Sequence, residues 1–378
     1  MHTLTEDFLK VQRIYFRILG FDIVKGNNGW LHPCKTLWVL ISLAAVQPMI
    51  VAFSLKNVEN VDRLTDGLGS VLVNLLSLLK FGLIIWLHKD FRQLVDKFQN
   101  MLSREYESEV SAKIISQENR REQRVSGFYK NSFVLTGALS CLMPIVSIVL
   151  FYSQTGEWQL QLTFPCIYPW DNGKMYNSLF SYVLLVSATT GAVLPTICVD
   201  TFFTALTHNL VALFKTAQYK MQLFGVVRLA EILLLYRSSL DMSNALNRYF
   251  RLIICMQLVV ASLLLCVLSY TLSENYAQPQ MPFYAVFTLT VLLQLYIYCY
   301  CGEYLKTESR EFARAIYDSP WYEATAIIPE IGRSLQISMI RAQRGSHIDG
   351  YFFEANMEVF LSIVMTAGSY FTLLRSIS

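Results

Sequence analysis

Seven stretches of mostly apolar residues recur along the chain, and each is close to the roughly 20 residues that a helix needs to cross a bilayer. Polar segments separate these stretches, so the pattern predicts an all-α, polytopic membrane protein. The seventh stretch is the least apolar, because serine, threonine and glycine interrupt it, and this content suits close packing or a wet lumen. The predicted spans are residues 36–54, 68–87, 133–152, 179–199, 252–272, 283–300 and 359–374.

Lysine and arginine are sorted unevenly between the segments that separate the spans. Of the 31 such residues, 25 lie in the four segments on one side and 4 in those on the other, while Lys80 and Lys130 lie within or beside spans. Positive residues concentrate in cytoplasmic loops. We therefore predict that the N-terminus is inside the cell and the C-terminus outside. A G-protein-coupled receptor has the reverse orientation, so that alternative is disfavoured.

The inner segments have helical patterns of their own. Apolar residues recur at helical spacing from Leu4 to Ile18, interleaved with Lys10, Arg13 and Arg17, and Thr3 and Glu6 could form a capping box. This helix could lie on the membrane surface or pack against the inner side of the protein itself. Apolar stripes in residues 90–125 and 226–250 predict that spans two to six continue as helices inside the cell. Residues 329–341 predict another short helix.

Composition and motifs exclude several classes of function. Apolar residues make up 54% of the chain and charged residues only 16%, with a mean hydropathy of +0.38 and a net charge of +3. These values argue against a soluble enzyme, a disordered chain and a nucleic-acid-binding protein. No nucleotide-binding, metalloprotease or serine-hydrolase motif occurs, and the five histidines are scattered. We expect no catalytic residues, no cofactor and no metal site.

Charged residues within the spans are few. Lys80 lies in the inner half of the second span, and for this position we favour a salt bridge or a side chain that reaches the membrane surface over a role in binding substrate. Asp200 and Glu303 lie close to the inner boundary and are interpreted in the same way. The scarcity of buried charge and the lack of an internal repeat disfavour a secondary transporter.

Aromatic and small residues gather in the outer halves of spans two, three, four and six. An apolar pocket with one or two polar groups is what a small volatile ligand needs. The alternative is that these side chains face lipid or neighbouring helices. The candidate ligand-binding residues are Val71, Leu72, Leu75, Ser147, Phe151, Phe180, Leu184, Ala188, Tyr284 and Phe287.

Two motifs near the C-terminus resemble those of a known family. Gly302-Glu303-Tyr304-Leu305, followed by Glu308-Ser309 and by residues 315–322, is similar to the end of the sixth helix of insect odorant receptors. Residues 369–375 are similar to the signature of their seventh helix, and Asn356 and Phe360 fit the pattern before it. Related gustatory receptors, the nearest alternative, end that helix with a Gln-Phe pair that is missing here.

The resemblance implies a subunit of a heterotetrameric, ligand-gated, non-selective cation channel in the plasma membrane of a sensory neuron. It implies a small volatile organic ligand, membrane lipid and a co-receptor subunit as partners. The short link at residues 218–228 lacks the long insertion of the co-receptor and points to a ligand-specific tuning subunit. The implied gate is at Phe371, Thr372, Leu373 and Leu374. The expected parts are an N-terminal helix (1–35), a six-helix membrane domain (36–304), a cytoplasmic anchor segment (305–349) and a pore-lining helix (350–378).

Overall fold

The computed structural model describes residues 9–22, 33–155, 166–170, 175–223, 227–274, 281–322 and 329–377. Thr3 and Glu6 lie outside the described residues. The described chain forms helices α2 (Lys10–Leu19), α3 (Pro33–Lys56), α4 (Val61–Trp86), α5 (His88–Glu105), α6 (Glu109–Thr155), α7 (Met175–Gln222), α8 (Leu229–Glu274), α9 (Met281–Tyr317), α11 (Pro329–Arg344) and α12 (Met357–Ile377). A two-stranded antiparallel hairpin, β1 (Asp349–Gly350) and β2 (Phe353–Glu354), precedes α12.

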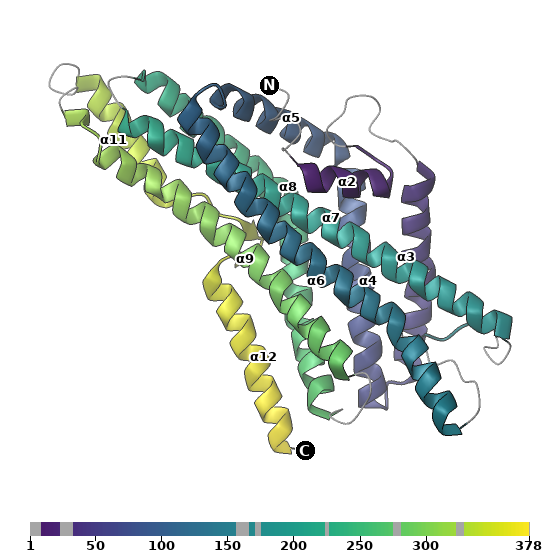
Figure 1. Cartoon of the computed structure of the whole chain (residues 1–378). Coiled ribbons are helices and arrows are strands. Elements are labelled where there is room, and N and C mark those ends of the chain that lie inside the picture. The colour runs from purple at the N-terminus through teal and green to yellow at the C-terminus, as the bar shows by residue number, and fades with distance from the viewer. Residues whose placement is uncertain are drawn as a thin grey trace.

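The membrane-spanning helices form one bundle (Figure 1). Six described helices, α3, α4, α6, α7, α8 and α9, are long and apolar enough to cross a membrane, and they contain the first six predicted spans. The seventh predicted span coincides with α12, a shorter apolar helix. Helix α2 lies at one end of the bundle and the C-terminal end of α12 at the other (Figure 1). The prediction of an all-α, multi-pass membrane protein is confirmed.

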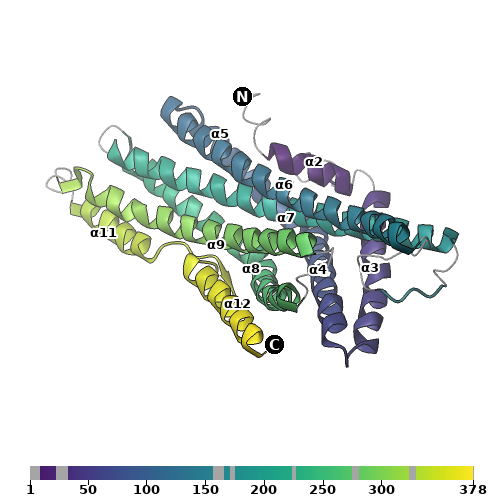
Figure 2. The ribbon, with the colours of Figure 1, turned by 60° about the horizontal axis from the view of Figure 1, so that its bottom comes forward.

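Four of the spanning helices extend well beyond a bilayer. Helices α6, α7 and α8 have 47, 48 and 46 residues and α9 has 37, against the roughly 20 that a crossing requires. The prediction that the second span also continues was wrong, because α4 ends at Trp86 and α5 begins at His88 after a break at Leu87. The break lets α5 bury its apolar face, which includes Phe91 and Phe98, across the bundle (Figure 2).

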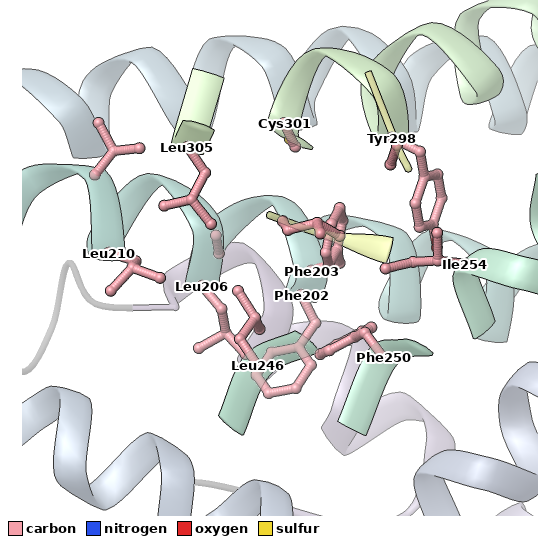
Figure 3. Close-up of a cluster of buried hydrophobic side chains, with 14 of the residues drawn as sticks. Phe202, Phe203, Leu206, Leu210, Leu246, Phe250, Ile254, Tyr298, Cys301 and Leu305 are labelled. Atoms are coloured by element: carbon pink, nitrogen blue, oxygen red, sulfur yellow. The ribbon is translucent and has the colours of Figure 1, made fainter. Parts of the chain in front are cut away.

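Helix α7 is the centre of the fold. Every residue from 195 to 214 is buried, so this helix has no lipid-facing or solvent-facing side over that length. Its aromatic residues meet those of α8 and α9 in a buried cluster (Figure 3). Phe203 stacks on Tyr298 with 4.9 Å between ring centroids and lies 5.1 Å from the ring of Phe250. This packing fixes the inner extensions against one another.

The N-terminal helix α2 packs against the protein itself. Its residues Gln12, Phe16 and Leu19 are buried, and the Gln12 amide donates to Glu122 Oε1 at 2.9 Å and to the Thr201 carbonyl at 3.1 Å. The amphipathic pattern left two alternatives for this helix, a place on the membrane surface and packing against the protein itself. One face of α2 packs against the protein. Ile14 and Ile18, on the other face, remain exposed.

Close contacts attach α12 to the inner bundle. A methyl group at Gly302 of α9 would lie 1.9 Å from the carbonyl oxygen of Ala355, so only glycine allows this approach. Asn356 Oδ1 accepts the backbone N–H of Val359 at 2.9 Å and caps the first turn of α12. Lys306 forms a salt bridge of 2.8 Å with Glu354. Helix α12 is therefore held at its inner end by α9 and the hairpin.

Candidate ligand-binding site

A cavity of about 130 Å³ lies within the bundle between α4, α6, α7, α8 and α9. Its apolar walls include Val73, Leu76 and Phe133, and Phe283 stacks on Phe287 with 5.9 Å between ring centroids. The lining residues are Thr65, Asp66, Gly69, Ser70, Val73, Leu76, Ser77, Phe133, Thr136, Gly137, Ser140, Thr189, Ala192, Val193, Thr196, Leu264, Val267, Leu268, Thr271, Phe283, Tyr284, Phe287, Thr290, Val291 and Gln294. Apolar walls with a few polar groups are the usual composition of a small-molecule site.

Hydroxyl pairs tie together the helices around the cavity. Ser77 of α4 and Thr196 of α7 lie 3.2 Å apart, and Thr136 of α6 and Thr290 of α9 lie 2.7 Å apart. Near the first turn of α4, the Tyr284 hydroxyl donates to Asp66 at 3.1 Å. These side-chain bonds between helices fix the shape of the cavity without filling it.

A buried ion pair lies about one helical turn beyond the cavity residues Ser77 and Thr196. Lys80 Nζ of α4 lies 2.6 Å from Asp200 Oδ1 of α7, and both side chains are 1% exposed. Tyr298 donates to the same oxygen at 2.6 Å, while Tyr129 and Gln294 donate to Oδ2, the latter at 2.7 Å. Burying two charges costs several kcal/mol unless hydrogen bonds satisfy them, as they do here. Of the two roles predicted for Lys80, a salt bridge or a side chain that reaches the membrane surface, the structure shows the salt bridge.

This ion pair is linked directly to the cavity wall. Gln294 lines the cavity, and its amide nitrogen bonds both Asp200 and the Tyr129 hydroxyl. Ligand contact with Gln294 would therefore reach a network that joins α4, α6, α7 and α9. The ten candidate ligand-binding residues include none of this network, although Lys80 and Asp200 stand out in the sequence as charges at membrane depth. The network consists of Lys80, Tyr129, Asp200, Gln294 and Tyr298.

A second polar cluster joins the inner extensions. Glu118 of α6 accepts from His208 at 3.2 Å and from Lys215 at 2.8 Å, and the Tyr304 hydroxyl donates to it at 2.9 Å. Burial alone would raise the Glu118 pKa, but these hydrogen bonds and the Lys215 charge outweigh burial and lower the pKa to about 2. Glu118 is therefore an anion at neutral pH, and the cluster holds α6, α7 and α9 together.

Comparison with known proteins identifies the family. Residues 60–368 match the family model described as 7tm Odorant receptor. Over 385 aligned residues, the chain is 44% identical to Odorant receptor 47a of Drosophila melanogaster, covering 99% of this chain and 100% of the relative. The chain belongs to the odorant receptor family. Putative odorant receptor 98b of the same organism is 43% identical, with 95% of this chain and 96% of the relative covered.

Solved structures of an odorant receptor have the same fold. The insect olfactory receptor OR5 from Machilis hrabei, in complex with eugenol, superposes with a TM-score of 0.83 over 98% of each chain at 14% identity. Another structure of the same receptor gives a TM-score of 0.80 at 13% identity over 99% of each chain. At these identities the likeness establishes the fold, and the fold agrees with the prediction.

Two of the ten residues predicted to bind ligand line the cavity of this odorant receptor, namely Tyr284 and Phe287 of α9. Three others, Val71, Leu184 and Ala188, belong to a separate small apolar cluster between α3, α4 and α7. Leu72 packs against the main core. The prediction and the cavity thus share helices and differ mainly in which face of each helix is involved.

The remaining predicted residues lie away from the cavity wall or outside the description. Leu75 and Phe180 are 38% and 56% exposed, and the Phe180 ring lies against Trp170 with 5.1 Å between centroids. Ser147 is half-buried near the end of α6. The side chain of Phe151 lies outside the described residues.

The candidate residues chosen from the sequence did not include the hydroxyl-bearing faces of α4 and α7 or any residue of the fifth span, which is part of α8. Ser70 and Ser77 are seven residues apart on α4, Thr189 and Thr196 seven apart on α7, and all four line the cavity. That spacing returns each pair to one side of its helix. Polar residues at helical spacing inside apolar spans were therefore the signal that could have found the cavity.

The predicted gate lies near the C-terminal end of α12. Phe371 is half-buried and Thr372 exposed, while the side chains of Leu373 and Leu374 lie outside the described residues. Along the same helix, Leu361 and Met365 are 49% and 66% exposed. Helix α12 contacts α8 and α9 and diverges from the rest of the bundle (Figures 1 and 2).

Proposed function

We propose that this odorant receptor is the ligand-binding subunit of a heterotetrameric, ligand-gated, non-selective cation channel in the plasma membrane. The observation that carries the proposal is the cavity of about 130 Å³ between five helices, with apolar walls and a few hydroxyl groups. Such a site suits a small volatile ligand. Eugenol, the molecule bound by OR5 from Machilis hrabei, is of this kind.

The proposed orientation places the N-terminus in the cytoplasm and the C-terminus outside. It rests on the distribution of lysine and arginine, of which 25 fall on the inner side and 4 on the outer side. An odd number of crossings agrees with α2 and the end of α12 lying at opposite ends of the bundle (Figure 1). In this orientation the cavity lies in the outer half of the membrane.

We assign the pore to α12 and its counterparts in the other subunits. The helix contains Ser362, Thr366, Ser369 and Thr372, and apolar side chains on it are exposed in the single chain. Both features suit contact with neighbouring subunits and a wet lumen. The gate would lie at residues 371–374, and the co-receptor would supply the other pore helices.

The route from ligand to pore runs through α8 and α9. Both helices line the cavity and both contact α12. A ligand that fits the cavity better when these helices stand in the open arrangement would shift the equilibrium toward the open pore. The ion pair behind Gln294 would hold α4 and α7 as the fixed wall against which α9 moves.

Membrane lipid is the other proposed partner. The exposed residues Ile14 and Ile18 of α2 accompany the basic residues Lys10 and Arg17 on the inner side. A helix with this combination can rest at the boundary between head groups and acyl chains. One face of α2 would then contact lipid while the opposite face packs on α7.

Odorant-evoked current in cells that express this chain with the co-receptor tests the proposal. Ala192→Phe would fill part of the cavity and is expected to raise the effective concentration of an active volatile at least about tenfold. The matched control is Leu289→Phe, since Leu289 is 65% exposed on α9 and does not line the cavity. Surface labelling of both variants checks delivery. An equal loss of odorant sensitivity in the two variants would refute the proposal. So would the absence of current to any volatile despite delivery to the cell surface.

A further inference from the structure

Most hydroxyl groups in the cavity wall have an acceptor for their proton within the protein. Ser70 and Ser77 of α4 donate to the carbonyls of Asp66 and Val73, one turn earlier on the same helix. Thr136 of α6 donates in the same way to the carbonyl of Ser132. A hydroxyl has one proton and two lone pairs, so while these bonds hold each group offers a ligand only an acceptor. In the Ser77–Thr196 and Thr136–Thr290 pairs, the two protons are shared among the partner hydroxyl and the two helix carbonyls.

The other three helices around the cavity repeat this arrangement. On α7, Thr189 and Thr196 donate to the carbonyls of Leu185 and Ala192. Thr271 of α8 and Thr290 of α9 likewise donate one turn back. Thr65 and Ser140, the two other aliphatic hydroxyls of the wall, are left out of this set of acceptors.

The Tyr284 hydroxyl and the Gln294 amide also donate to groups within the protein. The Tyr284 hydroxyl donates to Asp66, whose carboxylate has no proton to offer when ionised. The Gln294 amide donates to Asp200 and to Tyr129. Because the Asp200 carboxylate accepts only, the Gln294 NH₂ group must face it, and this fixes the direction of Gln294 Oε1. No described residue donates to that oxygen.

We infer that the cavity prefers volatiles that carry a hydrogen-bond donor, such as alcohols, phenols and amines, over matched ethers, ketones and esters. The inference rests on the proposed function, since it names the ligand class for that cavity. A donor-bearing ligand finds several lone pairs, with Gln294 Oε1 the most firmly oriented. A ligand that only accepts has to compete, at these groups, with a bond that the protein already makes.

Matched ligand pairs test the preference in cells that express the chain with the co-receptor. Suitable pairs are 2-heptanol with 2-heptanone and 4-methylphenol with 4-methylanisole, each with nearly the same shape. The expected result is an effective concentration about tenfold or more lower for the donor of each pair, equivalent to one unpaired polar group. Equal potency, or greater potency of the ketone and ether, would overturn the inference.

Gln294→Met tests the assigned acceptor directly. The substitution keeps the length of the side chain and removes the oxygen, and the donor preference is expected to fall to about threefold or less. Since Asp200 also loses a donor, Thr290→Val provides a second variant that leaves the ion-pair network intact. Its control is Thr288→Val, because Thr288 makes the same bond to its own helix but does not line the cavity.

Different results would refute the proposed channel function and the inferred ligand class. Strong currents that Ala192→Phe suppresses, with no donor preference, would overturn the ligand class and leave the channel function standing. No current to any volatile, these pairs included, with normal surface delivery would overturn both. A reduced preference in Thr290→Val and an unchanged one in Thr288→Val would support the inference, while an equal change in both would contradict it.

Discussion

Replacing Asp200 by asparagine is expected to destabilise the receptor by about 3–5 kcal/mol, because the change leaves the Lys80 ammonium buried without an anion. The two charges lie 2.6 Å apart and both side chains are 1% exposed. With an effective dielectric constant of about 20, a pair at this distance attracts by roughly 6 kcal/mol. Asparagine keeps one oxygen that can accept from Lys80, so the expected loss is smaller than the full attraction.

Thermal unfolding of the detergent-solubilised receptor measures this loss. A fluorescent fusion heated in steps and followed by size-exclusion chromatography should lose its folded peak at a temperature lower by on the order of 5–10 °C. Lys56→Met, which removes an exposed lysine at the end of α3, is the matched control and should melt as the wild type does. Lys80→Met combined with Asp200→Asn removes both charges and should recover part of the loss. If Asp200→Asn melts within about 1 °C of Lys56→Met, the ion pair does not stabilise the bundle as argued.

Two further predictions concern the inner bundle. Gly302→Ala should displace the hairpin from α9, since the new methyl group would meet the Ala355 carbonyl at 1.9 Å, and should reduce odorant-evoked current per surface receptor, whereas Gly82→Ala, with open space around it, should not. Equal currents in the two variants would refute this account of the α12 attachment. The lowered Glu118 pKa of about 2, against an ordinary 4.5, contributes about 3 kcal/mol of stability that is fully present above pH 4.5 and is lost as the pH falls toward 2. The difference in melting temperature between wild type and Glu118→Gln should therefore narrow across that window, and a constant difference would contradict the assigned pKa.

Much of the fold could be predicted from the sequence. All seven apolar stretches lie within helices of the structure, apart from Leu87 at the end of the second, because a segment of this length and composition has few alternatives in a bilayer. The long helical extensions were predicted from amphipathic stripes, and α11 was predicted from apolar residues at the same helical spacing. The turn at Leu87 could not be predicted, because the apolar stripe of α5 resumes directly after α4 and the pattern does not tell a bent helix from a continuous one.

The cavity was harder to predict than the helices around it. Helical depth and aromatic content indicated Tyr284 and Phe287, but they could not decide which face of α4 or α7 turns inward, because both faces are apolar. The hydroxyl residues at helical spacing favour one face, but only contacts between residues far apart in the chain, such as Ser77 with Thr196 and Thr136 with Thr290, fix that choice. Lys80 and Asp200 are 120 positions apart, so the sequence indicated a salt bridge for each without showing that they pair.

A structure of the heteromeric channel with its most potent odorant bound tests the central claim most directly. The account predicts ligand density in the cavity between α4, α6, α7, α8 and α9, in contact with Phe287 and within hydrogen-bond distance of Gln294. It also predicts a wider separation of the α12 helices around residues 371–374 than in the ligand-free channel. Ligand density at another place on the subunit, with this cavity unchanged, would contradict the account.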